Sequence, residues 1–593
     1  MTAGPNVDSV AILYGSESGN AQDYAYFLAR KLRYNSLRPT VCSLDSFPLK
    51  SLVTDIQYLI VVCSTTGQGE VPRNSKKFIK FLLKKKLPDD LLNHIKFTTF
   101  GLGDSSYPKF NYAIKKIHIR LRQLGCKELC PRCESDEQSP EGIDGYYAEW
   151  ETSVIDALQK EFPNIYSIDD HVLLPPVFKM NVKEDGFDAT EDSDLSITRR
   201  SKGLSIGTVV KNERKTAEGH FQDVRHMIVE DNEHNLSYIP GDTLALYPPN
   251  DDRSVDLLLE SQPHWLPFAD KPLEIESAPD VEGGFIDSSQ LTLRSLIKYH
   301  LDVMSIPRRS FFALLHHFVD ESTEEGQREK EKLYEFSTLA EAEDLYDYAN
   351  RPRRSILETI MEFEKNLKIP LEYVLDLFPL IKVRLFSIAS KSSTDTVEII
   401  AGIVEYKTIL RRIRRGLCTK WIKSLKEGDS LVFSIHKSNL SFSLPDNPNP
   451  PILMVSPGTG VAPMKSLIEQ KAGQQELHLF YGCRFPNKDY LFQELWETLE
   501  AKGLLHMYPC FSREPGSKVK YVQDKIFVEQ KTVAKLILEE NAIVFVCGSS
   551  GNMPRQVRMT LVEILKKTGL EEADADKYLL RMEDSGRYIQ ETW

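Results

Sequence analysis

Three features of the sequence predict a multidomain α/β protein. Its 593 residues are enough for roughly three to four domains, and 41% of them are hydrophobic, so each domain can bury a core. Near the N-terminus, short apolar runs alternate with helical patterns and polar loops, which is typical of a doubly wound parallel sheet. The middle of the chain is rich in strands interrupted by helical periodicity, and apolar strands return near its end. We therefore expect a parallel sheet, then a β-barrel with a helical insertion, then a second α/β domain.

The N-terminal sheet is predicted from three apolar runs that each end in a polar loop. The runs cover residues 10–14, 58–63 and 97–102, and helical patterns separate them. Loops that follow the strands of a doubly wound sheet gather at its carboxyl edge, where these folds bind ligands. In the first loop, residues 15–20, serine hydroxyls, an asparagine amide and a glycine turn lead directly into a helix. Such donors at a helix N-terminus suit a phosphate monoester.

A second phosphate loop is predicted in residues 452–463. An apolar strand breaks at Gly458 and Gly460, and a helical pattern follows. Because glycine has no Cβ, backbone N–H groups can approach a pyrophosphate closely, and the positive end of the helix favours the anion. The third position of the G-x-G-x-x-G pattern is Pro463, a departure from the usual dinucleotide fingerprint. An ordinary strand-to-helix turn therefore stays the alternative at this position.

A weakly patterned stretch, residues 161–200, separates the first sheet from the strand-rich middle of the chain. Within it, residues 182–199 are acidic and nearly free of aliphatic side chains, which fits either an extended tether or an acidic surface loop. Strands follow, and helical periodicity over residues 291–319 and 333–375 interrupts them. This pattern predicts a barrel with a helical insertion.

Composition excludes several classes of function. The net charge of −12 argues against a general nucleic-acid binder and allows docking onto a basic partner surface. Nine scattered cysteines, an odd number, fit a reducing compartment. Cys130 and Cys133 form a C-x-x-C motif with no second pair or histidine at zinc spacing, so we expect no metal site there. No run of about 18 apolar residues occurs, and we expect a soluble, cytoplasmic protein with neither membrane nor nucleic-acid partners.

The three N-terminal loops and an acidic pair after them resemble the FMN-binding loops of flavodoxin-like domains in diflavin reductases. By this resemblance the first loop holds the FMN phosphate, the next two flank the flavin ring, and Tyr107 stacks on it. Thr66 stands where the second loop often carries an aromatic residue, so less of one flavin face is expected to be covered. The FMN-binding residues implied in this way are Ser16, Glu17, Ser18, Gly19, Asn20, Ala21, Ser64, Thr65, Thr66, Gly67, Leu102, Gly103, Asp104, Ser105, Ser106, Tyr107, Pro108, Lys109, Phe110, Asn111, Asp136 and Glu137.

A four-residue motif, Arg-Leu-Phe-Ser at residues 384–387, looks like the FAD-binding strand of ferredoxin-reductase-like barrels. An arginine can form two hydrogen bonds to a pyrophosphate, and an aromatic ring can stack on a flavin. A hydroxyl can polarise the flavin atom that accepts hydride. Gly416 resembles the glycine that opens the loop and helix at the second FAD phosphate, and Arg353 matches an arginine placed on the flavin nucleotide. The residues implied for FAD are Arg353, Arg384, Leu385, Phe386, Ser387, Gly416, Leu417, Cys418, Thr419 and Trp593.

A basic segment after residue 511 is similar to the family's site for the 2′-phosphate and adenine of NADP. Positive charge at this place separates NADPH from NADH. The commoner Lys-x-Tyr is here Lys-Val-Lys-Tyr, one residue longer, so Lys518 and Lys520 are both candidates for the phosphate contact. The residues implied for NADP are Gly458, Thr459, Gly460, Ser512, Arg513, Lys518, Lys520, Tyr521 and Gln523.

The same family pattern implies a hydride path lined by Ser387, Cys547 and Glu591. Cys547 resembles the thiol beside the nicotinamide, Trp593 resembles the aromatic that stacks over the FAD ring, and Glu591 stands where the family usually has an aspartate. The catalytic residues implied are Ser387, Cys547, Glu591 and Trp593.

The resemblance covers nearly the whole chain in family order and looks closest to soluble NADPH-dependent diflavin oxidoreductases, which lack the membrane anchor of cytochrome P450 reductase. It implies a flavodoxin-like FMN-binding domain (1–160), an acidic linker (161–200), an FAD-binding β-barrel (201–447) with a helical insertion at about 250–375, and an NADP-binding domain (448–593). It also implies electron transfer from NADPH through FAD and FMN to an anamorsin-type iron–sulfur protein in cytosolic iron–sulfur assembly. A diflavin reductase for methionine synthase or a P450, and a non-catalytic interaction protein with the same fold, stay open as alternatives.

Overall fold

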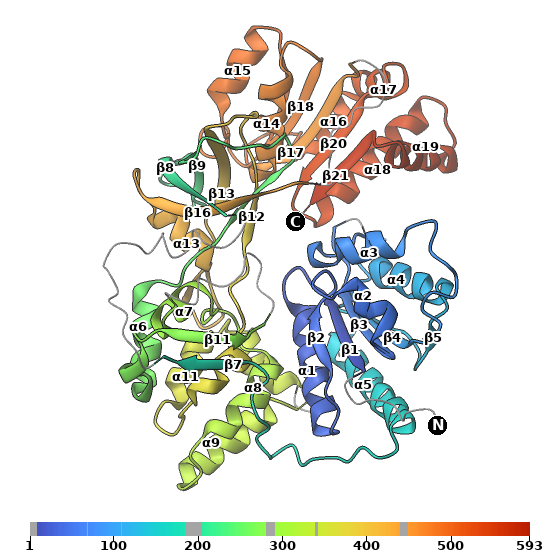
Figure 1. The fold of residues 1–593 in the computed structure, drawn as a ribbon. Helices are drawn as coiled ribbons and strands as arrows, with labels where there is room; N and C mark the ends of the chain where they lie inside the picture. Colours follow the sequence, from blue (N-terminus) through green and yellow to red (C-terminus); the bar gives the residue numbers. More distant parts are fainter. Residues whose placement is uncertain are drawn as a thin grey trace. The chain divides into compact units, whose positions relative to one another are not determined.

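The computed structural model describes residues 9–67, 69–107, 109–140, 142–183, 204–279, 291–338, 342–438 and 449–592. The chain forms two compact units. Each is built from segments that are distant in the sequence and therefore differ in colour in Figure 1. Unit 1 comprises Met1–Ala189, Asn250–Lys382 and Thr408–Arg412, and unit 2 comprises Thr190–Pro249, Val383–Lys407 and Ile413–Trp593. The chain therefore passes between the units five times, so neither can be cut out as one segment.

Unit 1 begins with a parallel sheet of order β2-β1-β3-β4-β5, in which β6 also pairs with β4. The strands are β1 (Val10–Gly15), β2 (Thr40–Ser43), β3 (Tyr58–Ser64), β4 (Lys96–Gly103), β5 (Lys127–Glu128) and β6 (Cys133–Asp136). The connecting helices are α1 (Asn20–Tyr34), α2 (Leu49–Thr54), η1 (Arg73–Ser75), α3 (Lys76–Leu82), α4 (Tyr112–Gln123) and α5 (Gly142–Glu161). This order is that of the flavodoxin-like doubly wound sheet, which confirms the expected parallel sheet.

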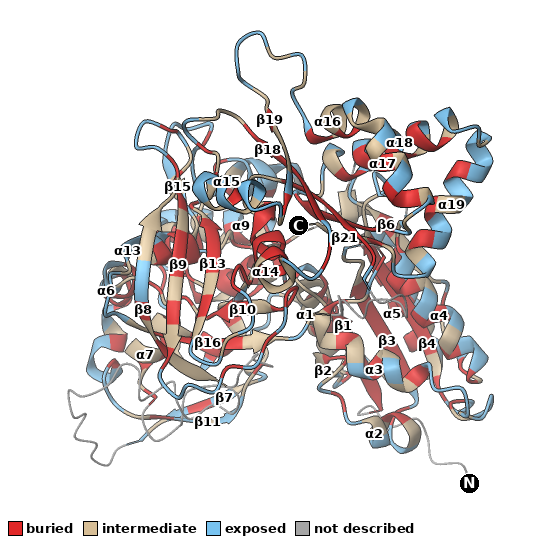
Figure 2. Ribbon diagram, turned by 90° about the horizontal axis from the view of Figure 1, so that it is seen from above, coloured by how far each residue is buried: buried red, intermediate tan, exposed pale blue. Residues whose placement is uncertain are grey.

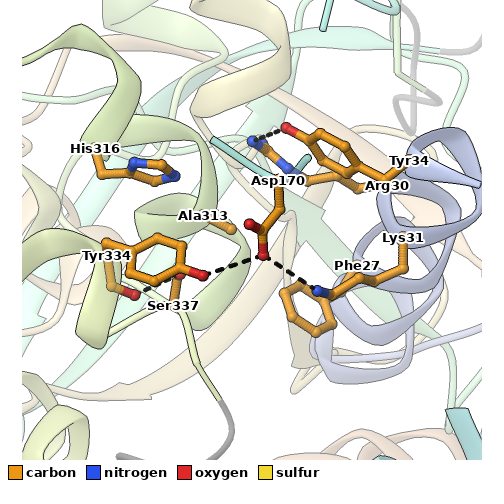
Figure 3. Close-up of a pocket in the computed structure, with 9 residues that line it drawn as sticks. All are labelled: Phe27, Arg30, Lys31, Tyr34, Asp170, Ala313, His316, Tyr334 and Ser337. Carbon is orange, nitrogen blue, oxygen red and sulfur yellow. Dashed lines mark hydrogen bonds and ion pairs between the residues drawn. The ribbon is translucent and has the colours of Figure 1, made fainter. Parts of the chain in front are cut away.

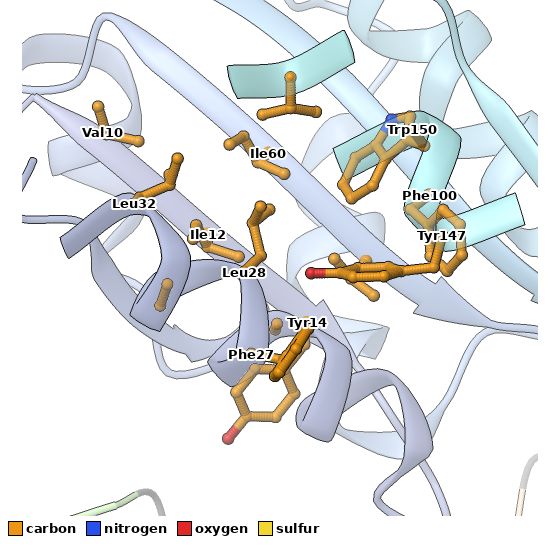
Figure 4. Packing of buried hydrophobic residues seen from close by; sticks show 14 of the residues in the cluster. Val10, Ile12, Tyr14, Phe27, Leu28, Leu32, Ile60, Phe100, Tyr147 and Trp150 are labelled. Atoms are coloured by element: carbon orange, nitrogen blue, oxygen red, sulfur yellow. The ribbon is translucent and has the colours of Figure 1, made fainter. Parts of the chain in front are cut away.

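Both faces of this sheet are covered, so β1 and β3 are buried along nearly their whole length (Figure 2) and consist almost entirely of apolar residues. Along β1, Val10, Ile12 and Tyr14 pack against α1 and α5, together with Tyr147 and Trp150 of α5 (Figure 4). The alternate residues of β1 face α2, α3 and α4 on the other side. Because successive side chains of a strand point to opposite faces, one apolar run supplies both cores.

The rest of unit 1 is helical. A short antiparallel pair, β7 (Lys179–Val182) and β11 (Leu273–Ser277), accompanies it. The helices are α6 (Asp252–Ser261), η3 (Pro263–Phe268), α7 (Leu293–Tyr299), α8 (Arg309–Leu315), η4 (His316–Phe318), α9 (Glu324–Glu335), α10 (Ala342–Leu345), η5 (Tyr346–Asn350), α11 (Ile356–Phe363), η6 (Leu371–Tyr373) and α12 (Val374–Leu377). The helical insertion predicted from periodicity is thus a set of short helices.

The expected linker, residues 161–200, contains one strand among its described residues, namely β7. Residues 184–203 lie outside the described part of the chain, so the tether and the predicted domain boundaries stay predictions. No helix in the described ranges is long and apolar enough to cross a bilayer.

Unit 2 contains a six-stranded sheet of order β12-β10-β16-β8-β9-β13, in which all pairings are antiparallel. The strands are β8 (Ser205–Arg214), β9 (Val224–Asp231), β10 (Thr243–Leu246), β12 (Arg384–Ser387), β13 (Thr396–Gly402) and β16 (Ser430–His436). A hairpin of β14 (Glu405–Lys407) and β15 (Ile413–Arg415) precedes α13 (Leu417–Ser424). Among the described residues, one isolated bridge, Ile388 with Ile399, joins the segment after edge strand β12 to edge strand β13. Closure into the expected barrel is not confirmed.

The second sheet of unit 2 is parallel, in the order β19-β18-β17-β20-β21. Its strands are β17 (Ile452–Pro457), β18 (Leu477–Cys483), β19 (His506–Phe511), β20 (Ile543–Gly548) and β21 (Tyr588–Thr592). Its helices are η7 (Gly458–Gly460), α14 (Val461–Lys471), α15 (Gln493–Ala501), α16 (Val522–Val528), α17 (Gln530–Leu538), α18 (Asn552–Lys567) and α19 (Glu572–Asp584). Side chains of α14 and α15 pack on one face, and those of α16 to α19 pack on the other. The expected second α/β domain is confirmed.

Candidate cofactor sites

The first loop of unit 1 is shaped to receive an anion at the start of α1. Gly19 has a φ of 97°, and its N–H donates to Ser16 Oγ at 3.0 Å. The Ser16 N–H donates to Asn74 Oδ1 at 2.9 Å, which anchors the loop to the neighbouring segment. No side chain caps α1, so the N–H groups of its first turn are available to a ligand.

The second and third loops are tied together beside it. The Thr65 N–H donates to the Leu102 carbonyl at 3.1 Å, and the Ser105 N–H donates to Asp136 Oδ1 at 2.9 Å. Hydrogen bonding from Ser105 lowers the pKa of the Asp136 carboxyl, so this group stays ionised and fixes the loop. Asn111 is fully buried and donates to the Ser135 carbonyl at 2.9 Å. Its side chain therefore supports the loop from beneath.

These loops fit FMN. The α1 N-terminus offers an anion site, Tyr107 is 39% exposed, and a Cβ added at Gly67 would meet no atom within 4 Å. An open loop with an exposed aromatic ring can cover a planar group. Of the residues implied for FMN, Pro108 lies outside the described residues.

Arg308, which sequence reasoning missed, lies against the same phosphate loop in unit 1. Its Nη1 donates to the Gly19 carbonyl at 2.7 Å and its Nη2 donates to Asn20 Oδ1 at 2.8 Å. Lys382 Nζ donates to Gln22 Oε1, also in the first turn of α1, at 2.6 Å. Two cations from the helical part of unit 1 thus reach the first turn of α1. The only sequence signal is a pair of arginines after Pro307, far from any flavodoxin-like motif.

A small pocket lies at the other end of α1, where helices of the insertion pack on it (Figure 3). The Tyr334 hydroxyl donates to Asp170 Oδ2 at 3.1 Å, and Lys31 Nζ lies 3.9 Å from the same oxygen. Arg30 donates to the Tyr34 hydroxyl at 3.3 Å. The pocket lies beside the second half of α1, away from the phosphate loop, so it forms part of the packing between α1 and the insertion.

In unit 2, residues expected for FAD lie on β12 and at the start of α13. Arg384 is exposed at the sheet edge, Phe386 packs partly on the sheet core, and Ser387 is the register partner of Thr243. Gly416 precedes α13, whose first turn no side chain caps. Cys418 is buried, and burial raises the pKa of its thiol to about 12.

An exposed arginine and a helix N-terminus fit an FAD phosphate. The Thr419 hydroxyl accepts from the Val404 N–H at 3.1 Å, which fixes the start of α13 to the hairpin before it. Arg353 belongs to unit 1, in a turn after η5, with a φ of 54°.

The loop after β17 combines an open glycine with a tightly packed one. Gly458 has a φ of 58°, and a Cβ there would meet nothing within 4 Å. A Cβ on Gly460 would lie 2.4 Å from the Cys547 carbonyl. The second glycine is thus required by packing against β20, a reason that the sequence does not reveal. The Ser456 hydroxyl, at the end of β17, is buried without a partner.

A group of exposed side chains follows β19. Arg513, Lys518 and Lys520 are exposed, and Tyr521 is 54% exposed. The Arg513 guanidinium lies 5.9 Å from the ring centre of Phe221. Exposed positive charge after β19, at the carboxyl edge of the parallel sheet, fits a phosphorylated nucleotide.

Cys547 and Glu591 are register partners on β20 and β21. Cys547 is fully buried, and burial, with the nearby Glu591 carboxylate, raises the pKa of its thiol well above the ordinary value. The thiol therefore stays protonated at neutral pH. Trp593 lies outside the described residues.

An ionic network, also missed from the sequence, joins the antiparallel sheet of unit 2 to α14. Lys465 of α14 lies 2.9 Å from Glu398 Oε2 and donates to the Ala389 carbonyl at 3.1 Å. His226 Nε2 lies 2.8 Å from the same carboxylate oxygen. Although burial opposes ionisation, the contacts with His226 and Lys465 hold the pKa of Glu398 at about 2. The network thereby fixes the helix that follows the phosphate loop.

Three family models match the chain in succession. Residues 12–150 match the family model "Flavodoxin", residues 200–421 match "FAD binding domain", and residues 454–558 match "Oxidoreductase NAD-binding domain". The NADPH-dependent diflavin oxidoreductase 1 of Debaryomyces hansenii is 64% identical over all of both chains. Its namesakes from Candida albicans and Saccharomyces cerevisiae are 57% and 41% identical, each over 98% of this chain and 99% of the relative.

The chain belongs to the NADPH-dependent diflavin oxidoreductase family. It is an oxidoreductase, and its cofactors are FMN, FAD and NADPH. The family expected from the loop motifs is thus confirmed. The individual site residues stay predictions, because similarity over whole domains assigns no role to single side chains.

Proposed function

We propose that this diflavin oxidoreductase passes electrons from NADPH to an anamorsin-type iron–sulfur protein in cytosolic iron–sulfur cluster assembly. When bound, NADPH supplies two electrons as hydride, FAD accepts them together and FMN releases them singly. The presence in one chain of a first loop shaped to receive an anion, an exposed arginine at the edge of a sheet and a basic loop after β19 supports the electron relay, and the acceptor rests on the family resemblance alone. We place the reaction in the cytoplasm as part of the same proposal.

The residues of unit 1 would bind and orient FMN. The first turn of α1 and the loop of Ser16 and Gly19 would hold the phosphate, and Tyr107 would stack on the ring. Asp136 and Asn111 would position the loops from behind, since their side chains are engaged with loop backbone and neighbouring strand.

The residues of unit 2 would bind FAD and NADPH. Arg384 and the start of α13 would hold the FAD pyrophosphate, and Phe386 and Ser387 would lie at the flavin ring. The antiparallel sheet would form the FAD-binding barrel of the family, and the Ile388–Ile399 bridge supports this part of the proposal. Arg513, with Lys518 or Lys520, would hold the 2′-phosphate of NADPH. Cys547 would meet the nicotinamide as a neutral thiol, with Glu591 beside it and Trp593 over the FAD ring.

An anaerobic NADPH titration of the purified protein, with released flavins identified by chromatography, tests the cofactor part. We expect equimolar FAD and FMN, both bleached by NADPH. Release of FAD alone would mean that the FMN assignment is wrong, and no flavin after reconstitution would favour a non-catalytic interaction protein.

The acceptor is tested by offering an anamorsin-type protein, methionine synthase and a cytochrome P450 to the reduced enzyme under identical conditions. We expect rapid reduction of the iron–sulfur protein only. Preferential reduction of either other acceptor would reject the acceptor assignment and leave the reductase activity intact.

A further inference from the structure

Three side chains with metal-binding atoms meet at the amino-terminal ends of β18 and β19. Glu476 directly precedes β18, His478 is in β18, and His506 begins β19. One ligand atom from each lies within 4.8 Å of the other two. Glu476 Oε1 is 3.0 Å from His478 Nε2 and 3.7 Å from His506 Nε2. Because the strands are parallel, this cluster lies at the sheet edge opposite the nucleotide loops.

Strand geometry explains why these side chains converge. Glu476 and His478 are two residues apart and therefore project to the same face. His478 and His506 are register partners, and their rings stack with centres 4.6 Å apart and planes 18° apart. The Tyr508 hydroxyl lies 3.2 Å from His478 Nδ1. A contact of this kind orients the ring and directs Nε2 toward the carboxylate.

The donor set is that of a zinc site. Two imidazole nitrogens and one carboxylate oxygen are ligands that Zn²⁺ uses with water in the fourth position. Tetrahedral coordination at ordinary bond lengths separates ligand atoms by about 3.4 Å. The distances from Glu476 Oε1 to the two imidazole nitrogens, 3.0 Å and 3.7 Å, lie on either side of this value. Half of each of the Glu476 and His506 side chains is exposed, whereas His478 is buried. An ion can therefore enter from solvent.

We propose that Glu476, His478 and His506 bind one divalent transition-metal ion of the Zn²⁺ class and that the ion clamps β18 to β19. The same two strands end at Cys483 and Phe511, where the Ser512 N–H donates to the Cys483 carbonyl at 2.9 Å. A clamp at one end of this strand pair stabilises the register that places Ser512 and Arg513 at the other.

The test uses the full-length holoenzyme after chelator treatment, titrated with Zn²⁺ alone by calorimetry. We expect one saturable site and a rise in the thermal unfolding midpoint on zinc addition. His506→Ala removes a ligand that is half exposed, so the fold survives, and we expect at least about tenfold weaker binding. Glu476→Gln keeps the shape without the charge and should weaken binding as well. His94→Ala, an exposed histidine of unit 1, should bind zinc like the unchanged protein.

Cobalt in place of zinc identifies the ligands through its visible spectrum. Nitrogen and oxygen coordination without a sulfur-to-cobalt charge-transfer band is expected. Absence of saturable zinc binding, equal affinity in His506→Ala, or a sulfur band would each overturn the proposal, the last by placing the ion on cysteines. Flavin content is measured in parallel, so loss of cofactor is distinguished from loss of metal.

Discussion

At the scale of single residues, preference for NADPH over NADH is expected to depend on Arg513. Arg513→Ala should raise the KM for NADPH by roughly ten- to hundredfold, because one charge-assisted contact with the 2′-phosphate contributes about 1.5 to 3 kcal/mol. The KM for NADH should change little. Steady-state kinetics with both nucleotides measures this, and equal effects on both would show that Arg513 does not contact the 2′-phosphate.

Arg308 is the residue through which the helical part of unit 1 contacts the phosphate loop. Arg308→Ala removes both of its hydrogen bonds, to Gly19 and Asn20. We expect about tenfold weaker FMN binding, as for loss of one charged hydrogen bond, with FAD content unchanged.

The flavin ratio after desalting measures the effect of Arg308→Ala. Arg328→Ala is the matched control, since Arg328 is exposed and pairs only with Glu324 among the ion pairs described. An unaltered FMN to FAD ratio in Arg308→Ala would mean that the loop holds its shape without this arginine.

At the scale of elements, the contact between α14 and β13 depends on a buried charge. Lys465→Met leaves the half-buried Glu398 carboxylate in contact with His226 but without its lysine partner. We expect a loss of about 3 to 5 kcal/mol in the free energy of unfolding of unit 2, because an uncompensated buried charge is costly. Urea denaturation measures it, and Lys471→Met on the same helix is the control. A loss no larger than in the control would contradict this role for the network.

The short helix η4 makes unit 1 sensitive to acid. Burial, together with the nearby positive charges of Arg30 and Lys330, lowers the pKa of His316 to about 2 and that of His317 to about 4. In the unfolded chain a histidine titrates near about 6.5. The unfolded state therefore binds more protons below that pH, so stability is complete above it and falls as pH drops toward the folded pKa values.

We expect the free energy of unfolding of unit 1 to fall from about pH 6.5 downward, by at most roughly 1.4 kcal/mol per pH unit for each histidine. His316→Phe should reduce this slope, and the exposed His94→Phe should not. Urea denaturation across the pH range provides the measurement. An unchanged slope in His316→Phe would show that His316 is not a source of the acid sensitivity.

At the scale of the whole molecule, the two units are built from interleaved segments and have separate cores. We expect calorimetry of the holoenzyme to give two unfolding transitions. NADP⁺ at about a hundredfold excess over its Kd should stabilise only the transition of unit 2, by about 2.7 kcal/mol. One shared transition, or an equal shift of both, would show that the units unfold together.

Much of this organisation could be predicted from the sequence, because local patterns encode it. Apolar runs that end in polar loops predicted both parallel sheets, since a strand buried on two faces must be apolar throughout. Glycines and serines before helices predicted the phosphate loops, since these residue types create anion sites locally. The order of the motifs indicated the family, which the full-length relatives confirm.

Contacts between distant segments were decided only by the tertiary structure. Arg308 reaches Gly19 across 289 positions, and Lys465 reaches Glu398 across 67. Glycine is required at position 460 because a Cβ there would clash with a carbonyl on another strand. The cluster of Glu476, His478 and His506 exists because parallel pairing sets β18 and β19 in register. By itself the sequence determined which segments form strands, helices and the polar loops between them, because these depend on neighbours along the chain. Which side chains meet depends on packing between segments, and that appears only when the chain is folded.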